Sequence, residues 1–176
     1  MPIIYYTKYT VTGLLTSIAA YGVIVGVLRS AYTDQAKEAY ISLFPTKTFN
    51  DAEWGAFRHA YASARFAQSL GEVNSKILGD LNEAANFHNN PQARDLDYYN
   101  NDQGILIGLS RTSTGRNFST DWGLAEVIKQ KIADNTIATN NRPGESEVPT
   151  NYEHSPYIPD ISARNAFFDQ LGSSIK

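Results

Sequence analysis

The sequence contains no cysteine and no concentration of positive charge. The absence of cysteine excludes disulfide bonds, thiolate zinc sites and cysteine nucleophiles. The 15 lysines and arginines are scattered along the chain and are outnumbered by 18 acidic residues, which leaves a net charge of −3. A chain of this kind offers no basic surface to a phosphate backbone, so we expect no nucleic-acid partner.

Length and apolar content predict one domain. The chain has 176 residues, of which 42% are hydrophobic, and division into two domains would leave both with undersized cores. Stretches of helix-forming residues with apolar side chains at helical spacing follow one another from Thr33 onward. The predicted fold class is mainly α, a single compact helical domain at 31–139. A hydrophobic helix at 1–30 precedes it, and a proline-rich tail with a short C-terminal helix follows at 140–176.

An uncharged segment of twenty residues, Tyr9 to Leu28, lies near the N-terminus. At about 1.5 Å per residue it is long enough to cross the roughly 30 Å hydrocarbon core of a bilayer. Gly22 and Gly26 give it a small-residue face for association with another helix. We therefore expect a membrane anchor, with the domain outside the cytoplasm. A cleaved signal peptide and a buried helix of the core are the alternatives.

Within the domain, several helix boundaries are predicted from local signals. Phe44-Pro45 ends a helix that begins near Asp34, and Gly71 separates a helix at 51–70 from another at 72–87. Further helices are expected at 103–109, at 122–135 after a cap at 119–121, and at 161–171, with a turn at 95–101. The stripe Trp54, Phe57, Tyr61 and Ala64 faces the core, whereas Arg58 and Arg65 point outward.

The polar chemistry is concentrated in two segments about forty residues apart. His59 lies in a strongly patterned helix, and an imidazole transfers protons near neutral pH when a carboxylate such as Glu83 or Asp97 orients it. Asn100 and Asn101 follow in the second segment. The competing interpretation is structural, because a semi-buried histidine and an asparagine that caps a helix require no substrate.

Neither segment predicts a metal site, and no cofactor is expected. The acidic turn at 95–102 resembles a calcium loop in composition, but Tyr99 and Asn100 occupy positions where an EF-hand requires an oxygen ligand and a glycine. Ser63 lies one turn after His59 but lacks the sharp turn of a hydrolase nucleophile. His88 and His154 are interpreted as surface residues in polar loops.

From about Pro45 to Asn141 the chain resembles a bacterial family of unknown function found in exported and toxin-like proteins. Three segments carry the resemblance: 55–61, Gly-Ala-Phe-Arg-His-Ala-Tyr; 81–83, Leu-Asn-Glu; and 97–104, which has the pattern Asp-x-x-Asn-Asn-x-x-Gly. Asn82 and Tyr99 stand where members of the family usually have histidine, so an all-histidine metal site is not implied here. The resemblance implies an exported domain, which together with the expected anchor suggests the bacterial inner membrane or cell envelope. It specifies no reaction.

Two functional hypotheses follow. In the first, an exported, membrane-tethered, hydrolase-like domain acts on the cell envelope, with His59, Glu83 and Asp97 as catalytic residues and with Arg58, Asn100 and Asn101 binding substrate. In the second, a non-enzymatic helical interaction module is anchored in the membrane and assembles with another envelope protein. The enzyme hypothesis requires His59 and the two carboxylates to converge on an open pocket.

Overall fold

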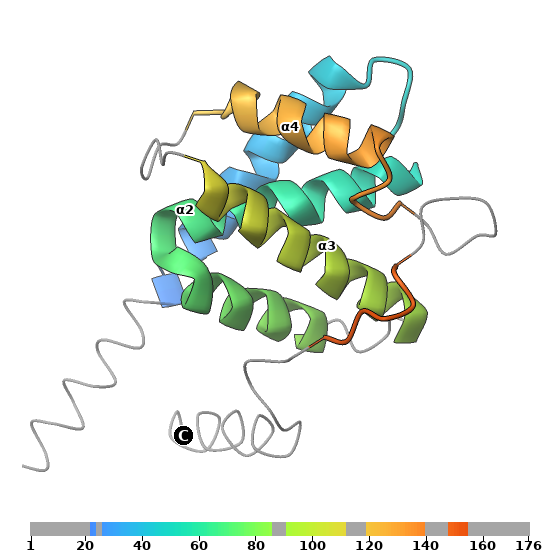
Figure 1. Cartoon of the computed structure of the whole chain (residues 1–176). Helices are drawn as coiled ribbons and strands as arrows, with labels where there is room; N and C mark the ends of the chain where they lie inside the picture. Colours follow the sequence, from blue (N-terminus) through green and yellow to red (C-terminus); the bar gives the residue numbers. More distant parts are fainter. Residues whose placement is uncertain (1–21, 24–25, 86–90, 112–118, 140–147, 155–176) are drawn as a thin grey trace, which may run out of the picture.

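The computed structural model describes residues 22–23, 26–85, 91–111, 119–139 and 148–154 (Figure 1). This part of the chain forms a single all-α domain, as predicted, and contains no strand. A first helix at 26–43 is followed by α2 (Ala52–Ala85), α3 (Pro91–Ser110) and α4 (Trp122–Ala133). Both α3 and α4 pack against α2, which makes α2 the centre of the domain.

Gly71 divides α2 into two helical arms, as the sequence predicted. Its backbone has φ 81° and ψ 171°, a conformation in which a side chain would be strained. The arm before Gly71 carries His59, and the arm after it carries Glu83. The break therefore allows one continuous element to supply two residues of the site from different directions.

The expected turn at 95–101 is wrong, because these residues lie inside α3. Pro91 begins the helix, a position where its missing N–H is not needed. Aspartate and asparagine favour turns, but this preference amounts to less than about 1 kcal/mol per residue, and packing against α2 outweighs it. The predicted short helix at 103–109 is the last part of the same element. Asn101 therefore lies inside α3 and is not a helix cap.

The main core lies between the first helix, the first arm of α2 and α4. All four residues of the predicted stripe, Trp54, Phe57, Tyr61 and Ala64, are buried there. Tyr40 packs edge-on against Trp54, with the ring centroids 5.2 Å apart. Asp121 caps α4, one of the three predicted capping residues, by accepting a hydrogen bond from the backbone N–H of Leu124.

The end of the predicted anchor contributes to the domain. Leu28 is 3% exposed and packs with Tyr32 and Phe66, whereas Val23 and Val27 are exposed. Residues 9–21 of the predicted membrane segment lie outside the described part of the chain. Among the residues that are described, none of the helices combines the length and the apolar character needed to cross a bilayer.

Candidate active site

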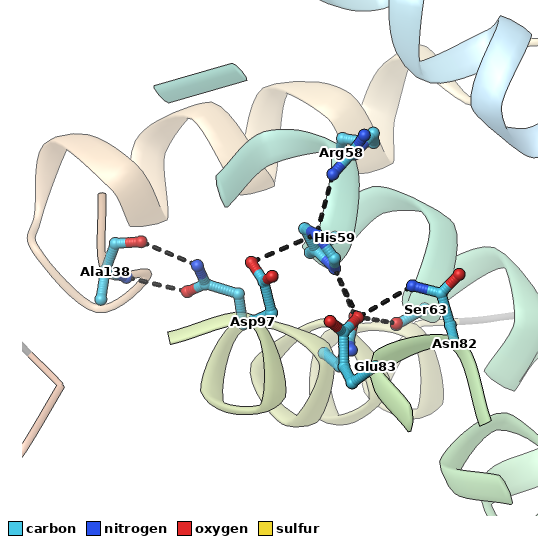
Figure 2. A network of polar contacts seen from close by, with 9 residues as sticks. Arg58, His59, Ser63, Asn82, Glu83, Asp97 and Ala138 are labelled. Atoms are coloured by element: carbon cyan, nitrogen blue, oxygen red, sulfur yellow. Dashed lines mark hydrogen bonds and ion pairs between the residues drawn. The ribbon is translucent and has the colours of Figure 1, made fainter. Parts of the chain in front are cut away.

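His59 is held in one orientation between α2 and α3. Figure 2 shows His59 between Arg58, Asp97 and Glu83. Its side chain is 7% exposed, and Nδ1 lies 3.2 Å from Oδ1 of Asn101 on α3. The same oxygen accepts a hydrogen bond of 2.9 Å from the Ser63 hydroxyl. Because an amide oxygen only accepts, Nδ1 carries the imidazole proton and Nε2 presents its lone pair.

Two charged groups face Nε2. Asp97 lies one turn before Asn101 on α3, and its Oδ1 is 3.2 Å from Nε2. Arg58 approaches from α2 with Nη2 3.0 Å from the same nitrogen. Asp97 is 19% exposed and Arg58 is exposed, so the Nε2 side of the imidazole is the side that leads toward solvent.

Glu83 lies on the Nδ1 side of the imidazole and is completely buried. Its Oε1 is 3.6 Å from Nδ1 of His59 and accepts a hydrogen bond of 2.9 Å from the side-chain amide of Asn82. Its Oε2 is also buried and has no hydrogen-bond partner among the described residues. One ligand atom each from His59, Glu83 and Asp97 can be chosen so that all three lie within 4.8 Å of one another.

Burial changes the pKa of the His59 imidazole and the pKa of the Asp97 carboxyl group. Loss of hydration, reinforced by the nearby Arg58, lowers the pKa of His59 to about 4, although Glu83 acts in the opposite direction. Burial and the negative charge of Glu83 raise the pKa of Asp97 to about 7. At neutral pH the imidazole is therefore uncharged, and the Asp97 carboxyl holds its proton to a higher pH than an exposed aspartate does.

Asp97 and Arg58 form part of the wall of an open cavity of about 490 Å³. The cavity lies beside the start of α2 and the first half of α3. The remaining wall includes aromatic, apolar and polar groups, among them Phe49, Asn50, Trp54, Leu96 and Thr139. A small molecule in this cavity would contact Asp97 and Arg58, the two residues that touch Nε2 of His59.

The structure thus brings together His59, Glu83, Asp97, Asn101 and Arg58, all of which were candidates from the sequence. Asn100 is directed elsewhere: its amide donates to the carbonyl of Ala138 at 2.8 Å and accepts from the Ala138 N–H at 3.0 Å. This pair of bonds ties the segment after α4 to α3.

Ser63 and Asn82 belong to the polar network, although neither was predicted as a residue of the site. Ser63 lies four residues after His59, and this helical spacing indicates that the two side chains are neighbours on one face. The same signal was available for α3, because Asp97, Asn101 and Gly104 fall at i, i+4 and i+7 on one helical face. Asn82 adjoins Glu83 in sequence, but nothing in the spacing indicates its bond.

Gly104 and Gly108 allow α3 to approach α2 closely. A Cβ atom at this position would lie 2.3 Å from the carbonyl oxygen of Ala60, and one at Gly108 would lie 2.4 Å from that of Ala64. The two helices therefore touch backbone to backbone directly beside His59. This contact brings Asp97 and Asn101 within hydrogen-bond distance of the imidazole.

The outward orientation expected for Arg65 is wrong. Its side chain is 0% exposed, and Nη1 lies 3.7 Å from the Asp121 carboxylate and 3.0 Å from the side-chain oxygen of Gln68. The guanidinium carbon also lies 5.1 Å from the centre of the Tyr32 ring. Helix 26–43 and the start of α4 cover this face of α2, so the arginine is enclosed with its counter-charge.

His154 is not a free surface residue, in contrast to the expectation from its loop composition. Nε2 is 2.9 Å from Asp80 and Nδ1 is 3.7 Å from Asp102, and the ring stacks on Tyr98 with centroids 3.9 Å apart. Tyr152 donates a hydrogen bond of 2.7 Å to Asp102. These contacts attach segment 148–154 to α2 and α3. His88 lies outside the described residues.

The His154 cluster predicts a pH-dependent contribution to stability. Burial opposes protonation of His154, but hydrogen bonds to Asp102 and Asp80 outweigh it and raise its pKa to about 9. A raised pKa stabilises the folded state fully below the unfolded pKa of about 6.5, and this contribution is lost as the pH rises through 9. We expect His154→Gln to cost about 1–2 kcal/mol at pH 6 and almost nothing at pH 10, since solvent screens part of the pairing. Urea denaturation of both proteins at several pH values measures the difference, and a constant difference would contradict the prediction.

A protein-family model described as a domain of unknown function (DUF6973) matches residues 23–136 of the chain. The match contains every residue of the candidate site. No significant match was found among curated proteins or among solved structures.

Proposed function

The chain belongs to the DUF6973 family of domains of unknown function, and from this premise we propose that it is a hydrolase-like enzyme acting through His59. One observation carries the proposal. The imidazole is fixed by Asn101 and Glu83 on its Nδ1 side, while the lone pair of Nε2 faces two residues that line an open cavity. This is the arrangement that a general base requires, an oriented imidazole with its free nitrogen toward the substrate.

The residues divide into distinct roles. His59 would accept a proton from a water molecule beside Nε2, and the Asp97 carboxyl group would hydrogen-bond to the same water molecule. Arg58, exposed at the edge of the cavity, would bind a negatively charged group of the substrate or of the transition state. Asn101, Ser63 and Glu83 position the imidazole and do not line the cavity.

We further propose that the substrate belongs to the cell envelope. This part of the proposal is supported by the resemblance to exported and toxin-like proteins and by the uncharged segment Tyr9 to Leu28. The alternative, a helical interaction module, is favoured by the exposed side chains Val23 and Val27, which are 67% and 53% exposed beside Gly22 and Gly26. The two hypotheses differ in what they require of His59.

The test compares two histidines in the full chain directed to the bacterial envelope. We expect His59→Gln and Asp97→Asn to reduce cell lysis by at least about 100-fold, the usual contribution of a general base. His154→Gln is the matched control, since this histidine is also partly buried and bonded to carboxylates but lies outside the site. It should retain lytic activity. Melting temperatures of all four proteins separate lost chemistry from lost folding.

Absence of lysis by the wild-type chain at comparable protein levels would exclude the envelope as its target. Unchanged lysis by His59→Gln would exclude the proposed base. If the loss in both site variants instead follows the fraction of unfolded protein, the polar network is structural and the interaction module becomes the better hypothesis.

A further inference from the structure

A completely buried carboxylate oxygen at the centre of the site has no partner among the described residues. This oxygen is Oε2 of Glu83, which belongs to a side chain with 0% exposure. Asn82 reaches only Oε1, and Arg58 contacts His59. Leaving one oxygen of a buried carboxylate without a donor or a cation is costly, so native proteins rarely do it without a functional reason.

We infer that His59, Glu83 and Asp97 bind a divalent transition-metal ion beside the cavity, next to the part of its wall that Asp97 forms. The inference rests on the proposed function in assigning the chemistry to this cavity, and it changes one role: with an ion on Nε2, His59 would be a ligand and no longer the base, and water bound to the ion would take the place of the water that His59 activates. The binding itself can be measured without a substrate. The three residues come from both arms of α2 and from α3, and one ligand atom from each lies within 4.8 Å of the others.

His59 has the orientation of a metal ligand. A ligating histidine commonly donates its second ring N–H to an oxygen of the protein, which fixes the tautomer and directs the free nitrogen at the ion. Here Nδ1 faces Asn101 Oδ1 at 3.2 Å, so Nε2, which contacts Arg58 in the absence of an ion, is the nitrogen that would bind it. Asp97 Oδ1 lies 3.2 Å from Nε2, and two ligands that share an ion with bonds of about 2 Å are themselves about 3 Å apart.

The ligand set selects the kind of ion. One imidazole with two carboxylates suits Zn²⁺ or Mn²⁺ better than Ca²⁺, which prefers six to eight oxygen ligands. Three protein ligands leave a coordination position open for water, as in catalytic zinc sites. Because Asp97 forms part of the cavity wall, the open position would be accessible to a substrate.

Arg58 is the natural competitor of this ion. Its guanidinium lies 3.0 Å from Nε2 and supplies positive charge where the ion would place it. The side chain is exposed, so it can turn into solvent when an ion binds. Removal of Arg58 should therefore strengthen metal binding, whereas removal of Glu83 should weaken it.

Isothermal titration calorimetry of the chelator-treated full chain with Zn²⁺ and with Mn²⁺ tests the inference. We expect one site per chain with a roughly micromolar or lower Kd for one of these ions. Glu83→Gln should weaken binding at least about 100-fold through loss of a ligand, and Arg58→Gln should tighten it about tenfold through loss of a competing charge. His154→Gln should bind like the wild type, which separates the site from the His154 cluster.

Absence of binding by the wild type, equal binding by Glu83→Gln, or loss of binding in His154→Gln would each overturn the inference. Circular dichroism verifies that every variant is folded, and Asp97→Asn provides a second ligand variant should Glu83→Gln fail to fold. The two proposals fail separately: lysis that depends on His59 but survives chelation overturns only the metal site. Metal binding by a chain that lyses no cells leaves the metal site in place and overturns only the proposed function.

Discussion

Replacing Gly104 with alanine is expected to lower the free energy of unfolding by about 3 kcal/mol, the upper end of the usual cost of overpacking. The new Cβ atom would lie 2.3 Å from the carbonyl oxygen of Ala60 and 2.7 Å from its Cα, both of them backbone atoms. No side-chain rotation relieves such a clash, so α3 must move away from α2. Gly108→Ala meets Ala64 in the same way, at 2.4 Å, and should behave similarly.

Gly55→Ala is the matched control, a glycine of the same helix pair with no atom within 4 Å of the added Cβ. It should be neutral or should stabilise the protein by about 0.5–1 kcal/mol, since alanine is the better helix former. Urea denaturation of the three variants and the wild type measures the effects. Comparable changes at Gly104 and Gly55 would show that the close helix contact contributes nothing.

The Gly104 variant also bears on the site. Asp97 and Asn101 lie on the same face of α3 as Gly104 and contact His59. Even a shift of about 1 Å would break hydrogen bonds of this length. If Gly104→Ala remains folded under stabilising conditions, we therefore expect it to lose metal binding, while Gly55→Ala retains it.

Arg65→Ala is expected to lower the free energy of unfolding by about 3–5 kcal/mol. The substitution leaves the carboxylate of Asp121 without the guanidinium that lies 3.7 Å away, and it opens a cavity beneath Tyr32. Because Asp121 also caps α4, the effect should extend to the docking of that helix. Thermal and urea denaturation measure the loss.

Arg29→Ala is the control for this prediction. Arg29 is exposed on the first helix, and its removal should change stability by no more than about 0.5 kcal/mol. Equal effects of the two substitutions would mean that burial of Arg65 contributes little. Arg65→Met is a further variant to measure. Methionine is apolar and of similar length, so comparing its stability with that of Arg65→Ala separates the effect of lost packing from the effect of lost charge.

The sequence by itself determined the fold class, several boundaries and most of the site. Periodic apolar residues placed Trp54, Phe57, Tyr61 and Ala64 in the core, because helical spacing puts them on one face. The helix break at Gly71 and the helix cap at Asp121 could be predicted because each depends on local backbone chemistry. His59, Glu83 and Asp97 were identified as a group from the chemistry of their side chains.

Tertiary structure alone decided what each polar residue contacts. The segment 95–101 became helix because packing against α2 outweighed its turn preference, and this register aimed Asp97 and Asn101 at His59 while Asn100 bonded Ala138. The sequence predicted that Arg65 and His154 are solvated. In the structure Arg65 pairs with Asp121 and His154 pairs with Asp80, each of them distant in the chain. Local sequence specifies backbone preference and amphipathic faces, whereas the partner of a buried charge depends on contacts between elements far apart in the chain.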